Sequence, residues 1–113
     1  MKEFMMIFRY APVPGMTLSP EQIQESIRQR QDWIGGIAAQ GKFVGANRLG
    51  FEGKTLKADK STIDGPYAEL KEIVGGYVIA KAGSLQEAVK LAEGCPVFQM
   101  GGSVEVRDIM ALS

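Results

Sequence analysis

The sequence predicts an α+β fold of the ferredoxin-like type, with the order βαββαβ and an antiparallel sheet covered on one face by two helices. Three observations lead to this prediction. Apolar segments typical of strands occur at residues 3–10, 42–49, 75–81 and 103–109. Two segments between them carry the start and stop signals of helices. The chain has 113 residues, which fits a single domain spanning residues 1–113.

The strand at residues 3–10 is apolar on both faces, which predicts that both faces are covered. Its faces consist of Phe4, Met6, Phe8 and Tyr10 on one side, and of Met5 and Ile7 on the other. The strand at residues 75–81 is divided in the same way, into Tyr77 and Ile79 on one face and Val78 and Ala80 on the other.

One apolar sheet face remains when two helices cover the other, and an apolar patch of that size rarely stays in water. We expect a second copy of the chain to pack against it sheet to sheet, as a homodimer. The alternative is that residues 50–72 of the same chain cover this face. The residues expected on it are Met5, Ile7, Val78 and Ala80.

The first helix is predicted to run from Ser19 to Gly41, because Ser19 and Gln22 match a capping box and Gly41 suits the C-terminal cap. Isoleucines at helical spacing predict its buried face, which consists of Ile23, Ile27, Ile34 and Ile37. The pair Gly35-Gly36 costs about 1 kcal/mol per glycine relative to alanine. Either another segment packs closely there, or the helix is weak there.

The second helix is predicted to begin at Ser84, where Ser84 and Glu87 match a second capping box, and to end at Gly94. Its inward residues are predicted to be Leu85, Ala88, Val89 and Ala92. Residues 50–63 are polar and contain glycine, which predicts a small hairpin with residues 54–57 as one arm. In the last strand the alternation predicts inward Val104 and Val106 and exposed Glu105 and Arg107.

The chain contains no histidine, and this absence excludes more chemistry than any other feature of the composition. It excludes Ser-His-Asp and Cys-His mechanisms and removes the usual ligand of zinc, copper and non-haem iron. Cys95 is the only cysteine, so no intrachain disulfide forms, and we interpret it as a small buried apolar residue. We therefore expect no cofactor and no metal.

Thirteen basic residues balance thirteen acidic ones, so the composition gives no support to nucleic-acid binding. No apolar run approaches the ~20 residues of a membrane span. The apolar run that follows Lys2-Glu3 is too short for a signal peptide. We expect a cytoplasmic protein without nucleic-acid or membrane partners.

The densest cluster of unusual residues lies between the polar segment and the strand at residues 75–81. It reads Asp64-Gly65-Pro66-Tyr67-Ala68-Glu69-Leu70-Lys71-Glu72, followed by Gly75-Gly76-Tyr77. The end of the chain reads Gly102-Ser103-Val104-Glu105-Val106-Arg107-Asp108-Ile109. In these motifs the sequence resembles the YCII-related (DGPF-domain) family. Tyr67 stands where the family has phenylalanine, and Asp108 stands where it has proline.

The resemblance covers nearly the whole chain and implies a dimeric α+β barrel with a cleft that binds a small molecule. Some relatives use a His-Asp pair as the catalytic acid and base. Because this chain has no histidine, only the aspartate position, Asp64, can be carried over.

Asp64 is the first candidate for catalysis, because a carboxylate held at a rigid Gly-Pro turn and partly removed from water can serve as a general base. The alternative is structural, with the Asp64 side chain accepting backbone N–H bonds to start the turn. In the catalytic interpretation, Tyr67 or Lys71 is the acid.

Three further residues are candidates for ligand binding. Arg9 and Arg48 end strands, where a guanidinium can hold an anionic group, and the alternative for each is a structural ion pair. Trp33 can stack on a ligand, or it can pack in the core or in the dimer.

The leading hypothesis is a dimeric small-molecule-binding protein that can be a cofactor-free acid/base enzyme acting on a small organic acid or aromatic substrate. The alternative is a non-catalytic accessory module that binds or regulates another protein. A concave pocket in which Asp64 and an arginine converge favours the first, and a flat exposed apolar patch favours the second.

Overall fold

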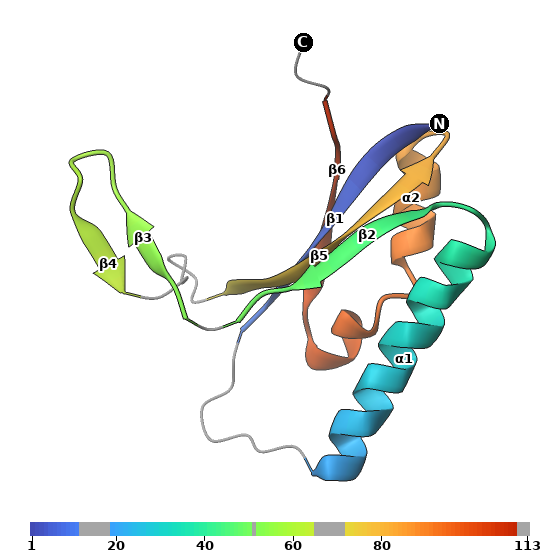
Figure 1. Cartoon of the computed structure of the whole chain (residues 1–113), viewed down its shortest axis with the longest axis horizontal. Coiled ribbons are helices and arrows are strands. Elements are labelled where there is room, and N and C mark those ends of the chain that lie inside the picture. Colours follow the sequence, from blue (N-terminus) through green and yellow to red (C-terminus); the bar gives the residue numbers. More distant parts are fainter. Residues whose placement is uncertain (12–18, 51, 65–71, 111–113) are drawn as a thin grey trace.

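The computed structural model describes residues 1–11, 19–50, 52–64 and 72–110, and Figure 1 shows a four-stranded sheet, helices beside it and a separate two-stranded hairpin. The strands are β1 (Lys2–Tyr10), β2 (Phe43–Arg48), β3 (Lys54–Leu56), β4 (Thr62–Asp64), β5 (Ile73–Ala82) and β6 (Ser103–Asp108). The helices are α1 (Pro20–Ala39), α2 (Leu85–Ala92) and the short 3-10 helix η1 (Pro96–Met100).

The strands of the main sheet are ordered β2-β5-β1-β6, and every neighbouring pair is antiparallel. This is the ferredoxin-like arrangement, so the predicted fold class is confirmed. The hairpin β3–β4 is inserted between β2 and β5, within the polar segment where a hairpin was predicted. The helix η1, which begins at Pro96, was not predicted.

The pairing of β1 with β5 decides which residues face the helices. Met6 lies opposite Val78 and Phe4 lies opposite Ala80, so these four residues share one face of the sheet. The described core consists of Phe4, Met6, Phe8, Ile73, Val78, Ala80 and Ala82 from the strands, with Ile37, Ala88, Ala92, Cys95 and Val97 around them.

The prediction that Val78 and Ala80 belong to the uncovered face is wrong. Alternation within one strand separates its residues into two sets, but only the register shows which set of a neighbouring strand shares a face. We call the side of the sheet away from the helices the open face. Its centre consists of four half-buried side chains, Met5 opposite Ile79 and Ile7 opposite Tyr77.

Only the second half of α1 contributes to the core. Ile37 is buried and Ile34 packs against the core, whereas Ile23 and Ile27 are exposed, so the predicted stripe is half right. The reason is visible in Figure 1, where the first half of α1 extends past the end of the sheet.

The second helix is too short to bury its whole apolar stripe. Ala88 and Ala92 are buried, as predicted, but Leu85 and Val89 are exposed, so their predicted inward position is wrong. An eight-residue helix makes only about two turns, and only the residues directly facing the sheet are covered.

The helix caps follow the sequence signals closely. The Ser19 hydroxyl accepts the backbone N–H of Gln22, and the Gln22 side chain accepts the backbone N–H of Ser19, which completes the predicted capping box of α1. At α2 the Ser84 hydroxyl caps Glu87 as predicted, but the Glu87 carboxylate accepts the N–H of Gly83 instead.

The glycine pair in α1 does not mark a helix crossing. No described atom of another segment lies within 4 Å of the point where a side chain of Gly35 or Gly36 would begin, and the helix continues to Ala39. Of the two expectations for this pair, close packing is therefore wrong.

The molecule is flat and extended. Its Cα atoms span 45 × 41 × 18 Å, and their radius of gyration is 15.6 Å, against about 13 Å for a compact domain of ~100 residues. Figure 1 shows the hairpin β3–β4 projecting away from the main sheet. This described part of residues 50–72 therefore does not cover the open face.

Candidate functional site

The end of the sheet where β5 begins is shaped by Gly75 and Gly76. A side chain on Gly75 would begin 2.2 Å from the ring of Tyr10, and one on Gly76 would begin 2.7 Å from the backbone oxygen of Asn47. Both are below any contact that real side chains make, so glycine is required for Tyr10 and β2 to approach β5 this closely. The glycines therefore bring β1, β2 and β5 together at this end.

Arg30 of α1 reaches this same end of the sheet. Its Nη2 lies 3.4 Å from the point where a Gly76 side chain would begin, and the Cα of Arg48 lies 3.3 Å from that point. Burial lowers the pKa of the Arg30 guanidinium, and the positive charge of Arg48 lowers it further. Cys95 and Tyr10 act in the opposite direction and raise the pKa of Arg30, so these two side chains also lie near its guanidinium.

Sequence reasoning missed Arg30, although a signal was present. Arg30 is three residues after Ile27 and four residues before Ile34, so it stands on the apolar stripe of the helix. A charged residue on such a stripe is either paired or directed at a site. The neighbouring Arg28 and Asp32, which pair on the exposed side of α1, gave the segment the appearance of a solvated face.

Arg48, a predicted ligand residue, ends β2 beside Arg30. Asn47 donates a hydrogen bond to the Tyr77 hydroxyl, and Tyr77 is on the open face. Because successive side chains of a strand alternate, Arg48 is directed to the helix-covered side, where Arg30 lies. We call Arg30 and Arg48 the arginine pair.

Arg9, the other predicted anion ligand, is on the opposite side of the sheet. It forms an ion pair with Glu105 across β1 and β6, on the open face. The structure therefore does not bring Arg9 and Arg48 together on one face.

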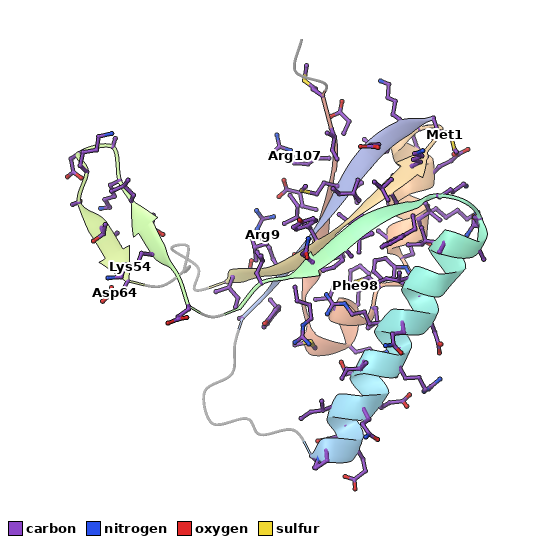
Figure 2. All side chains as sticks on the ribbon, in the orientation of Figure 1. Met1, Arg9, Lys54, Asp64, Phe98 and Arg107 are labelled. Atoms are coloured by element: carbon purple, nitrogen blue, oxygen red, sulfur yellow. The ribbon has the colours of Figure 1, made fainter. Side chains whose placement is uncertain are left out.

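Asp64 ends β4 on the projecting hairpin. Its side chain is 94% exposed and lies 3.5 Å from the ammonium of Lys54 on β3. Figure 2 shows this pair well away from Arg9, so the structure does not bring Asp64 and Arg9 together. Tyr67 and Lys71, the predicted acids, lie outside the described residues.

Trp33 has the contacts of a core residue. Its indole N–H donates to the backbone oxygen of Leu91 at 2.9 Å, and its ring meets the ring of Phe8 edge-on at 5.8 Å. Gly94 lies directly against the Trp33 ring as well. These contacts join α1 to the sheet and to the segment after α2.

Cys95 is buried, as interpreted from the sequence, and burial raises the pKa of its thiol. A protonated thiol is a poor nucleophile, so its surroundings favour a packing role. Within the described ranges, no group of His, Cys, Asp and Glu side chains is arranged to hold a metal ion.

Two hollows lie at the other end of β1, far from the arginine pair along the strand. Their volumes are about 420 and 530 Å³, and both are open to solvent around Lys2 and Asp108. Charges of both signs line them, and none of the predicted site residues does. We therefore place the candidate site at the end of the sheet where β5 begins, because the predicted ligand residue Arg48 lies there.

In the part of the chain that the structure describes, no helix is long and apolar enough to cross a membrane.

A family model described as the YCII-related domain matches residues 3–113. The chain therefore belongs to the YCII-related family, as its Asp64 and Gly75-Gly76 motifs indicated. No curated protein matches the chain.

The backbone of β2 approaches Gly76 so closely that no side chain fits there. Gly76→Ala should lower the free energy of unfolding by more than about 1 kcal/mol, because the new methyl group meets the backbone of β2, which cannot move aside cheaply. Gly36→Ala is the matched control, since its site in α1 is open. It should raise stability by about 0.4–1 kcal/mol. Urea denaturation measures both, and equal effects of the two substitutions would contradict the packing described.

Proposed function

We propose that the protein is a homodimeric small-molecule-binding domain whose ligand site is the end of the sheet where β5 begins. The observation that carries the proposal is Arg48. It ends a strand beside Tyr10, Gly75 and Gly76, and within the described ranges no carboxylate pairs with it. Arg48 is exposed and has no counter-charge in that part of the chain, so its guanidinium is open to an anionic group of a ligand.

The open face supports the homodimer. Its apolar centre of Met5, Ile7, Tyr77 and Ile79 lies across the two middle strands and is only half-buried in one chain. Polar and charged residues surround this centre, among them the pair of Arg9 with Glu105. An apolar centre with a polar rim is the usual composition of a protein–protein interface.

The catalytic part of the proposal is cofactor-free acid/base chemistry on a small organic acid or aromatic substrate. It assigns Asp64 as the base, Tyr67 or Lys71 as the acid, and Arg48 as the anion ligand. Arg9 is the alternative anion ligand, which would use the open face. A general base needs hydrogen-bond reach of its substrate, and in the described residues Asp64 contacts only Lys54 through its side chain. We therefore rank ligand binding above catalysis.

The second candidate function is a non-catalytic module that binds another protein. Ile23 and Ile27 on the exposed first half of α1 favour it, because they form part of an apolar stripe that the described core does not cover.

The homodimer is tested by Ile7→Lys. A lysine at the centre of the open face places a charge in the proposed interface, where burial without a partner is unfavourable. Size-exclusion chromatography with light scattering should give twice the mass of one chain for the wild type and one chain mass for the variant. Leu56→Lys on the projecting hairpin is the control and should remain dimeric. A monomeric wild type, or an Ile7→Lys variant that still dimerises, would contradict the proposed interface.

Ligand binding is tested by a thermal-shift screen of small acids, neutral aromatic compounds and amines. The proposal predicts that at least one class raises Tm in a saturable manner, because a ligand that binds only the folded state stabilises it. Asp64→Ala separates binding from catalysis, since it should leave the Tm shift intact if Asp64 acts only in the chemistry. A screen in which no class changes Tm would contradict small-molecule binding.

A further inference from the structure

We infer that Arg30 and Arg48 together bind the carboxylate of a small organic acid at the β5 end of the sheet. The inference rests on the proposed ligand site, names its ligand class and adds Arg30 as a ligand residue. Arg30 comes from the middle of α1 and Arg48 from the end of β2, so the helix and the sheet each supply one guanidinium.

The other arginines of the chain show that the arginine pair is exceptional. Arg9 pairs with Glu105, Arg28 pairs with Glu25 and Asp32, and Arg107 lies within 3.8 Å of Glu105. Arg30 and Arg48 have no ion pair or hydrogen bond through their side chains with any described residue. The two arginines of the described chain without such a partner are thus the two that lie against Gly76, Arg30 through its Nη2 and Arg48 through its Cα.

This arrangement is unfavourable without an anion. Arg30 is half-buried between α1 and Gly76, so water screens its charge less than at an exposed site. The adjacent positive charge of Arg48 opposes the charged state of Arg30. An anion between them removes the repulsion and supplies the missing hydrogen-bond acceptors. A bound anion therefore stabilises the folded state.

The surroundings favour a carboxylate on an organic molecule. A guanidinium presents two parallel N–H groups that match the two oxygens of a carboxylate. Phosphate sites commonly add the backbone N–H groups of a helix N-terminus. The described helices α1 and α2 begin at the N-caps Ser19 and Ser84, away from Arg30. The described helix that begins near Arg30 is η1, which has only five residues and starts with Pro96, a residue without a backbone N–H. The ring of Tyr10 adds an aromatic neighbour that suits an apolar or aromatic part of the ligand.

Thermal-shift measurements on the full chain test the inference with sodium benzoate, sodium acetate and inorganic phosphate as probes. Sodium chloride at the same ionic strength is the reference, and benzamide supplies the shape of benzoate without its charge. At ten times its Kd, benzoate should raise Tm by about 4–8 °C relative to chloride. Benzamide should leave Tm unchanged, and phosphate should have a smaller effect than benzoate.

Substitutions assign the effect to the arginine pair. Arg30→Gln and Arg48→Gln should each weaken benzoate binding by about tenfold or more, because each removes a charge-assisted hydrogen bond. Arg28→Gln is the matched control: it removes one charge from the exposed side of the same helix and should change the Kd less than twofold. If circular dichroism shows that Arg30→Gln is unfolded, Arg30→Lys keeps the charge without the two-pronged geometry and should weaken binding several-fold.

Three results would overturn the inference. They are equal stabilisation by benzamide and benzoate, stronger stabilisation by phosphate than by any carboxylate, and benzoate binding that Arg30 and Arg48 substitutions leave unchanged. If neutral compounds bind while every carboxylate fails, the proposed small-molecule function stands and only this inference falls. If no compound of any class changes Tm, both fall.

Discussion

The antiparallel pairing of β1 with β5 is the constraint on which the rest of the structure depends. Placing Met6 opposite Val78 gives the helices a continuous apolar surface, and the same register leaves Ile7 and Tyr77 together on the open face. Where β5 begins, the pairing also places Gly75 and Gly76 beside the end of β1. Tyr10 packs directly against Gly75, and the backbone of β2 packs directly against Gly76. The core, the proposed dimer surface and the candidate ligand site are therefore three consequences of one register.

The two faces of the main sheet differ in composition and therefore favour different binding partners. The helix-covered face is filled with apolar side chains except at the end where β5 begins, where Arg30 from α1 and Arg48 from β2 both lie beside Gly76. On the open face, the apolar centre is not covered by any described segment. Arg9, at the rim of this centre, already forms an ion pair with Glu105. An apolar surface without cover favours a second protein surface, and charge without a counter-charge favours an anion. The proposed division of ligand site and dimer surface between the two faces follows from this difference.

The fold was predictable because its signals are local. The capping box at Ser19, the order of apolar segments and the polar hairpin segment each depend on neighbouring residues, and each is confirmed. The errors concern relations between distant residues. The face of Val78, the exposure of Ile23 beyond the sheet and the placement of Arg30 against Gly76 all depend on register and on the position of α1. Arg48 was identified as a candidate, but Arg30 lies eighteen residues earlier on another element, and the sequence gives no indication that both lie beside Gly76.

The most direct test of this account is NMR of the arginine side-chain Nε–Hε groups of the full chain during a benzoate titration. The account predicts progressive, saturable shifts of the Arg30 and Arg48 signals, while the signals of the paired Arg9, Arg28 and Arg107 stay in place. Shifts confined to the paired arginines, or a titration in which benzoate raises Tm while the Arg30 and Arg48 signals do not move, would contradict it.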